Sequence, residues 1–282
     1  MVAPYQKKIK CFLYSLGFIL LNFSLSHTVK AAEIITTLPP LAGLVHWLEP
    51  DADVICLLPA NADPHHFQLS PRQIEILQQR GLLIRSSRDD GHWPSLQHTR
   101  QELDLWAIES KKDNLKIANH AWLNPKAVQI VLPKLAEKLK SIYPKHQAAI
   151  EQRLILALEE SEKVWQNWQQ VSRVEALNKS GVIMQHPSWT NLFQALSIPI
   201  LSSLESEQHG HEHGPRKLEK ALQLLQQRPS IRLIADSNHS NRALQWLQRH
   251  HSDSKISMLD ALGSCDESWV KLMQRNLEAL QR

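Results

Sequence analysis

Short runs of apolar, often β-branched residues alternate with helical patterns along most of the chain. A short apolar run between polar segments predicts a buried strand, and apolar positions spaced three or four apart predict a helix. Strands that alternate with helices in this way are typical of parallel sheets in an α/β fold. The predicted strands are Glu33–Thr37, Asp53–Leu58, Gly81–Ser86, Leu115–Ala118, Gly181–Gln185, Ile231–Ala235 and Ile256–Leu259.

Two predicted helices begin at a clear sequence signal. Ser70 precedes Pro71, and Asn124 precedes Pro125. A small polar side chain can cap the first free N–H groups of a helix, and proline suits the first helical position. We therefore expect helices to begin at Pro71 and at Pro125.

One helix is predicted to be much longer than the others. Apolar or small residues recur at spacings of three and four between residues 144 and 173, where Pro144 is the only proline and glycine is absent. This pattern predicts a helix of about 30 residues, or about 45 Å at 1.5 Å per residue. We expect it to connect two α/β lobes, residues 32–143 and 174–282. Its predicted buried face comprises Ile150, Leu154, Ala157, Ser161, Val164, Trp165, Trp168 and Val171.

Residues 1–31 have the features of a secretory signal peptide. Three lysines within the first ten residues precede an uncharged run over residues 11–26, and Ala31 and Ala32 follow it. The alternative is a membrane anchor, but the apolar run is shorter than the ~20 residues of a spanning helix. We therefore predict export to the periplasm and cleavage after Ala31.

Composition then excludes several classes of protein. The whole chain has 282 residues, with 32 Lys+Arg and 28 Asp+Glu, and the predicted signal peptide carries four lysines and no acid. The mature chain is therefore neutral, and no basic block suggests nucleic acid. An apolar content of 43% supports a packed core and excludes a disordered chain.

Two of the three cysteines, Cys56 and Cys265, remain in the mature chain. An oxidising compartment permits a disulfide between them. They are 209 positions apart, and sequence gives no sign that they lie close together. The sequence therefore favours two small buried side chains over a bridge.

The chain is rich in histidine, with 15 residues of this type. Parallel sheets bind ligands beyond the carboxyl ends of their strands, so polar residues that follow a strand are the first candidates. Imidazole and carboxylate together suit zinc, which four such ligands can enclose in a tetrahedron. The residues that follow predicted strands are His65, His66, His120, His186 and Asp260. Adjacent side chains rarely aim at one point, so we expect one of His65 and His66 to face away.

A second group, His209, His211 and His213, alternates with glycine and glutamate and predicts a surface loop. Such tracts bind metals weakly on composition alone, so this loop is a candidate accessory site that gathers zinc. The alternative is a polar loop with no such role. Six further histidines fit no pattern and are interpreted as structural: His92, His98, His146, His239, His250 and His251.

Four segments resemble the ligand segments of a known family. DPHHFQLSP, HAWLNP, MQHPSW and LDALG are similar to those of metal-specific solute-binding proteins of bacterial ABC transporters, especially periplasmic zinc-uptake proteins. The resemblance covers essentially the whole mature chain from ITTLPPLAGLV onward. It implies that His65 rather than His66 binds the metal, together with His120, His186 and Asp260.

The resemblance also implies an architecture and a partner. Family members have two α/β lobes joined by one long helix, with the metal between the lobes. A histidine at the third ligand position goes with zinc and a carboxylate with manganese, so His186 favours zinc. We expect a monomer that binds zinc and delivers it to an ABC transporter permease in the inner membrane.

The chain departs from the family pattern in two places. Zinc members often carry a histidine- and acid-rich insertion between the first two ligand segments, whereas the histidine-rich tract here follows the third. The segment SSRDDGHW also departs from the family's usual Gly- and Glu-containing pattern after that strand. These departures concern the accessory loop more than the four predicted ligands.

The sequence favours zinc delivery over other functions. A zinc hydrolase needs a general base beside an open metal position, but HExxH is absent, and neither Glu205 nor Asp236 is next to a ligand segment in the sequence. We therefore expect no enzymatic activity. The remaining alternatives are a manganese or iron binding protein of the same family and a secreted zinc chaperone or buffer without a permease.

Overall fold

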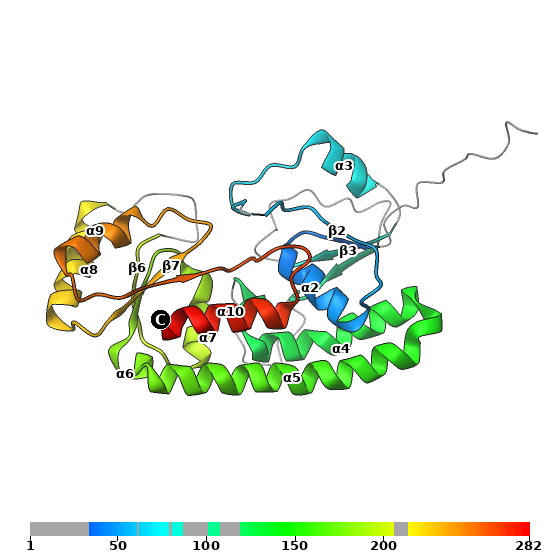
Figure 1. The fold of residues 1–282 in the computed structure, drawn as a ribbon. Helices are drawn as coiled ribbons and strands as arrows, with labels where there is room; N and C mark the ends of the chain where they lie inside the picture. The colour runs from blue at the N-terminus through cyan, green and yellow to red at the C-terminus, as the bar shows by residue number, and fades with distance from the viewer. Residues whose placement is uncertain (1–33, 61, 79–80, 87–100, 108–118, 206–213) are drawn as a thin grey trace, which may run out of the picture. The chain divides into compact units, whose positions relative to one another are not determined.

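The computed structural model describes residues 34–60, 62–78, 81–86, 101–107, 119–205 and 214–282. Two four-stranded sheets run through this part of the chain, and every strand pair in them is parallel. The fold is therefore of the predicted α/β class (Figure 1). The first sheet has the order β2-β1-β3-β4 and the second has the order β6-β5-β7-β8. The strands are β1 (Ile34–Thr36), β2 (Val54–Cys56), β3 (Leu82–Arg85), β4 (Gln101–Asp104), β5 (Val182–Met184), β6 (Ile200–Ser203), β7 (Arg232–Asp236) and β8 (Ile256–Leu259).

Each predicted strand within the described residues overlaps an observed one, and the candidate at Leu115–Ala118 lies outside them. Two observed strands, β4 and β6, were not predicted. Both lie at the edge of their sheet and carry polar residues, as in the sequence QELD of β4 and the serines that end β6. Edge strands need not be apolar on both faces, so they lack the run that marks a central parallel strand.

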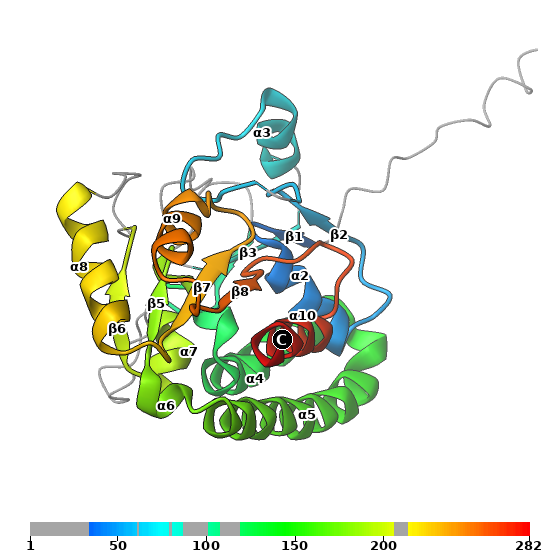
Figure 2. The same cartoon turned by 60° about the vertical axis from the view of Figure 1, so that its left-hand side comes forward.

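The helices pack on both sheets. The two expected starts are confirmed, because α3 and α4 begin at Pro71 and Pro125, and the Asn124 side chain accepts a hydrogen bond from the N–H of Lys126. Figures 1 and 2 show α2, α4 and α10 gathered along α5. The α-helices are α2 (Pro39–Leu48), α3 (Pro71–Gln78), α4 (Pro125–Ile142), α5 (Gln147–Val174), α6 (Leu177–Ser180), α7 (Thr190–Ala195), α8 (Pro215–Gln227), α9 (Arg242–His250) and α10 (Trp269–Gln281), and short 3-10 turns are η1 (Ala121–Leu123), η2 (Pro144–His146) and η3 (Pro187–Trp189).

The long helix predicted over residues 144–173 is α5, whose 28 residues follow the turn η2. At 1.5 Å per residue it is about 42 Å long. Every residue of its predicted apolar face is buried. The helix contacts α2 and α4 of the first half of the chain and α6 and α10 of the second, so it connects the two lobes.

The two sheets share one apolar core. Side chains alternate between the two faces of a strand. On one face of the second sheet, Val182, Met184 and Ile234 belong to the same buried cluster as the strands and helices of the first sheet. The opposite face, with Ile183 and Leu233, packs with α8 and α9 in a separate smaller cluster. The lobes are therefore continuous through a common core rather than joined by a solvated linker.

After β8 the chain crosses back to the first sheet. Its last helix, α10, contacts α2 and α5 as well as β8, and the ring of Trp269 stacks on Trp47 at 5.3 Å between centroids. Gly43 of α2 makes this approach feasible, because a Cβ there would lie 2.8 Å from the carbonyl oxygen of Glu267 and 2.9 Å from the Trp269 nitrogen. The two helices thus meet at backbone contact distance.

The two mature cysteines form a disulfide, Cys56–Cys265, so the preference for two separate buried thiols was wrong. The topology explains the error. Cys56 ends β2 in the first sheet, and Cys265 lies in the segment between β8 and α10 that crosses back to that sheet. The local sequence pattern does not indicate that the chain crosses back to the first sheet after β8.

In the described part of the chain, no helix combines the length and the apolar character that crossing a membrane requires. The predicted signal peptide, residues 1–31, lies outside the described residues, as do His92 and His98 and most of the segment SSRDDGHW.

The disulfide should contribute strongly to stability, because it closes a sequence separation of 209 residues. Replacing both cysteines, as Cys56→Ser with Cys265→Ser, should lower the free energy of unfolding by about 2–5 kcal/mol. Urea unfolding of the mature protein, followed by circular dichroism, measures this loss. Unfolding midpoints that coincide for the variant and the unaltered protein would contradict the assignment.

Candidate metal centre

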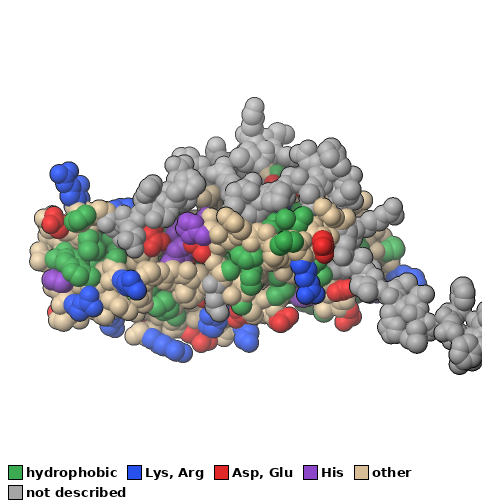
Figure 3. Space-filling view, turned by 90° about the horizontal axis from the view of Figure 1, so that it is seen from above, with side chains coloured by type: hydrophobic (Ala, Val, Ile, Leu, Met, Phe, Trp, Pro, Cys, Tyr) green, Lys and Arg blue, Asp and Glu red, His purple; other side chains and the backbone are tan. Residues whose placement is uncertain are grey.

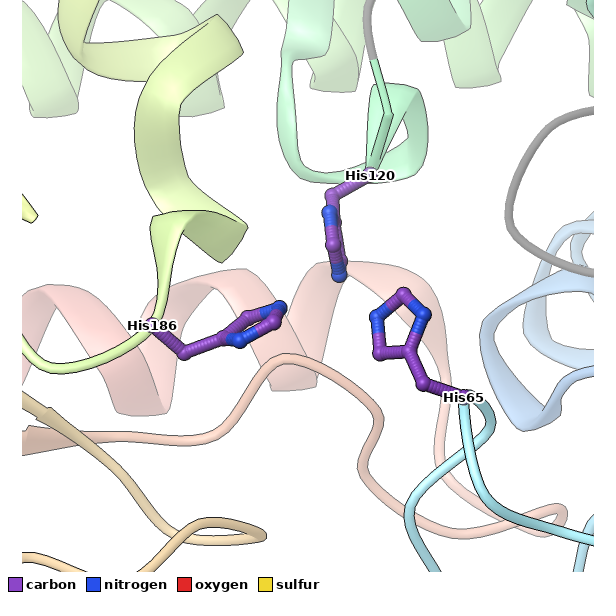
Figure 4. A group of neighbouring side chains, drawn as sticks. All are labelled: His65, His120 and His186. Carbon is purple, nitrogen blue, oxygen red and sulfur yellow. The ribbon is translucent and has the colours of Figure 1, made fainter. Parts of the chain in front are cut away.

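Histidine side chains gather on one face of the molecule beside carboxylates (Figure 3). Three histidines, His65, His120 and His186, form a group in which one ligand atom from each lies within 4.8 Å of the others. Their rings point toward one another from three different segments (Figure 4). The ring centroids are 5.2 Å apart for His65 and His186, 5.5 Å for His120 and His186, and 5.8 Å for His65 and His120.

His65 lies in the loop that follows β2. Asp63 organises this loop, because its carboxylate accepts a hydrogen bond of 2.8 Å from the backbone N–H of His65. The next side chain, His66, turns outward, is 62% exposed and lies 3.8 Å from the same carboxylate. Of the adjacent pair, His65 is therefore the residue that enters the group, as the family resemblance implied.

His120 is held in a left-handed backbone conformation with φ 58° and ψ 36°, directly before the turn η1. Few residues other than glycine adopt this conformation, so surrounding contacts must maintain it. The neighbouring Trp122 donates from its indole to the carbonyl of Ala261 at 2.7 Å, and its own carbonyl accepts from the Trp269 indole at 2.7 Å. His120 is thus anchored to the segment that crosses between the sheets.

His186 follows β5 and begins the turn η3. Its Nδ1 lies 3.3 Å from a carboxylate oxygen of Glu205. Its Nε2 is buried and has no hydrogen-bond partner among the described residues. Since Nδ1 faces the carboxylate, Nε2 is the nitrogen that His186 can offer to the group. A carboxylate on the far nitrogen is the usual way in which a metal-binding histidine is oriented.

The geometry suits a tetrahedral ion. With zinc–nitrogen bonds of ~2.0–2.1 Å, three imidazole ligands place their ring centroids about 5 Å apart, close to the observed separations. Burial, with the neighbouring His186, His65 and His239, holds the pKa of His120 well below its ordinary value. That imidazole is therefore neutral, which is the form that binds metal.

Asp260 does not lie in this group. Its carboxylate accepts hydrogen bonds of 2.9 Å from the backbone N–H groups of Leu262 and Gly263 and pairs with Arg275 at 2.9 Å. Burial alone would raise the pKa of Asp260, but these hydrogen bonds and the charge of Arg275 lower it. The residue predicted as fourth ligand thus pairs with Arg275 and lies outside the group of three histidines.

Two residues that the sequence interpretation set aside lie against His186. Glu205 also faces His239, at 3.1 Å from its Nδ1, and the rings of His186 and His239 stack with centroids 4.0 Å apart. Although burial alone would raise it, hydrogen bonds from His186, His239 and Gln185 hold the pKa of Glu205 well below its usual range. Glu205, which belongs to none of the ligand segments, and His239, interpreted from the sequence as structural, thus lie directly beside His186.

A signal for both residues was present in the sequence. Glu205 follows β6, a strand that was not predicted, and His239 follows β7 after Asp236. Applying the rule of post-strand residues to every strand of the second sheet would have selected them. Asp236 itself is buried and accepts a hydrogen bond of 2.6 Å from the Ser188 hydroxyl, and burial raises its pKa.

A small pocket adjoins His65 and His120. It has a volume of about 10 Å³, which is room for one water-sized ligand. Its lining comprises Pro64, His65, His120, Ser188, Asp236, Asn238, His239, Ala261 and Leu262. The candidate accessory residues His209, His211 and His213 lie outside the described residues.

Comparison with known proteins identifies the family of the chain. The family model described as "Zinc-uptake complex component A periplasmic" matches residues 34–282. A candidate metal-binding protein of Thermotoga maritima is 27% identical over 259 residues, which cover 88% of this chain and 91% of that protein.

Solved structures share the fold at low sequence identity. A crystal structure of ZnuA superposes with a TM-score of 0.72 at 18% identity, covering 89% of this chain and 98% of that one. A mutant of the laminin-binding adhesin Lmb from Streptococcus agalactiae gives 0.74 at 16% identity, covering 88% and 98%. A manganese-bound periplasmic metal-binding protein from Candidatus Liberibacter asiaticus gives 0.70 at 15% identity, covering 87% and 97%.

The placement of Asp260 predicts a structural effect of its substitution. Asp260→Asn can still accept from the backbone but loses the charge that pairs with Arg275, so the free energy of unfolding should fall by about 1 kcal/mol. Asp266→Asn, at an exposed position in the same segment, is the control and should change it little. Equal urea midpoints for the two variants would contradict the assigned role of Asp260.

Proposed function

Because the chain belongs to the family of periplasmic zinc-uptake components, we propose that it captures zinc in the periplasm and delivers it to an ABC-type permease in the inner membrane. The observation that carries this proposal is the convergence of His65, His120 and His186. Residues 1–31 act as the export signal. The metal is the transported cargo, and binding rather than catalysis is the function.

The donor set favours zinc over manganese. Three imidazole nitrogens suit zinc, whereas manganese prefers oxygen ligands. Structural neighbours include a ZnuA deletion mutant with zinc bound and manganese- and cadmium-bound forms of a periplasmic metal-binding protein. The fold therefore accommodates several ions, and the third ligand position selects among them. In this chain that position is His186, and a manganese or iron carrier is the second candidate.

The three histidines hold the ion, and the fourth position remains open to a small ligand from the adjoining pocket. The expectation that Asp260 binds the ion would require its pair with Arg275 to open. If Asp260 stays paired with Arg275, the substitution Asp260→Asn should weaken zinc binding by less than roughly tenfold. Roughly tenfold is the smallest loss that is usual when a residue that hydrogen-bonds a metal ligand is replaced. The accessory loop with His209, His211 and His213 gathers zinc for this site.

The adjacent histidines provide a matched test of the ligand assignment. His65→Ala removes a ligand and should weaken zinc binding by more than roughly 100-fold. Roughly 100-fold is the largest loss that is usual for a residue that only supports a ligand, so the loss of a ligand itself should exceed it. His66→Ala removes an exposed neighbour and should leave the affinity unchanged. Calorimetric titration of the mature protein, with a competing chelator where binding is tight, measures both. Equal loss in the two variants, or no loss in His65→Ala, would contradict the proposed site.

A further inference from the structure

A second set of metal-binding atoms lies directly beside the three histidines. It comprises His186, Glu205 and His239, and one ligand atom from each lies within 4.8 Å of the other two. The same carboxylate oxygen of Glu205 faces Nδ1 of His186 at 3.3 Å and Nδ1 of His239 at 3.1 Å. We call His65, His120 and His186 the inner triad, and His186, Glu205 and His239 the outer triad.

The outer triad is built as a ligand set. In a tetrahedral zinc site with bonds of ~2.0–2.2 Å, neighbouring ligand atoms are about 3.3 Å apart, and both nitrogen–oxygen distances are close to this value. Both imidazoles present Nδ1 to the same carboxylate oxygen, and their rings stack with 11° between the planes. Gln185 donates a hydrogen bond to the other oxygen of Glu205 and fixes the carboxylate.

The two triads differ in how far they are withdrawn from solvent. The side chain of His186, which both share, is 4% exposed, whereas those of His239 and Glu205 are 12% and 19% exposed. His239 also lines the small pocket beside His65 and His120. An ion at the outer triad would therefore lie next to the inner one and next to solvent.

His186 prevents both positions from being filled at once. Its Nε2 serves the inner triad, and its Nδ1 serves the outer one. A neutral imidazole carries a proton on one nitrogen and has a lone pair only on the other, so it binds one metal ion at a time. With an ion at the inner triad, Nδ1 carries its proton toward Glu205, and the outer triad is reduced to an orienting hydrogen bond.

We propose that His186, Glu205 and His239 form a second position for a divalent transition-metal ion, which alternates with the inner triad and holds the ion on its way in or out. This inference rests on the proposed function, because the ion is the same cargo. The exchange moves the ion between two nitrogens of one imidazole and shifts the imidazole proton to the nitrogen it leaves. No side chain other than His186 has to carry the ion between the inner and the outer triad.

The test removes the inner triad by substitution and measures the metal binding that remains. The variant of the full mature chain carries His65→Ala, His120→Ala, His209→Ala, His211→Ala and His213→Ala, so neither the inner triad nor the histidine-rich segment can bind. Zinc is titrated by calorimetry, and cobalt is followed by its visible absorption. We expect one equivalent to bind, more weakly than in the unaltered protein.

A further substitution then identifies the ligands. In this background, His239→Ala or Glu205→Gln should weaken the remaining binding by at least about tenfold. Glu205→Gln is the sharper of the two, because its amide oxygen still accepts the hydrogen bonds of both histidines but carries no charge. Circular dichroism verifies folding, and His65→Asn with His120→Asn replaces the alanine pair if that background does not fold.

The outcomes separate this proposal from the proposed function. If the unaltered protein binds zinc but the background variant binds neither zinc nor cobalt, the outer position is overturned. Remaining binding that is unaffected by His239→Ala and Glu205→Gln overturns it as well. If the unaltered protein binds no zinc, the proposed function fails, whatever the background variant does.

Discussion

The apolar core that the two sheets share is the constraint on which the rest of the structure depends. Val182, Met184 and Ile234 of the second sheet are buried in the same cluster as the first sheet and its helices. Separating the lobes would expose this surface, at a cost of about 25 cal/mol for each Å² of apolar area. The long helix α5 and the disulfide Cys56–Cys265 reinforce the same junction. We therefore expect metal binding to move loops and side chains rather than whole lobes.

A rigid junction explains how histidines from distant segments form one site. His65 and His120 belong to the first half of the chain and His186 to the second, and their mutual distances are set by the core rather than by local sequence. Rigidity also bears on release. A preorganised buried site binds its ion tightly and releases it slowly, and slow release would limit delivery of the ion. An alternative position at Glu205 and His239 offers the ion an intermediate state without any separation of the lobes.

Much of the fold and of the candidate site could be predicted from the sequence. The central strands and the buried face of α5 follow from local periodicity. The post-strand rule selected His65, His120 and His186 together with His66 and Asp260, and the family resemblance then favoured His65 over His66. The edge strands β4 and β6 lack that periodicity, and missing β6 concealed Glu205. The disulfide and the pairing of Asp260 with Arg275 depend on where the chain crosses between the sheets, which no local pattern records.

Anomalous diffraction from crystals of the mature protein, grown with equimolar zinc and manganese, tests the central claim most directly. Data collected on both sides of the zinc absorption edge place the ion without reference to any assumed ligand. The account predicts a zinc peak within ~2.0–2.1 Å of a ring nitrogen from each of His65, His120 and His186. A peak of manganese at these residues, or a principal zinc peak that does not touch them, would contradict it.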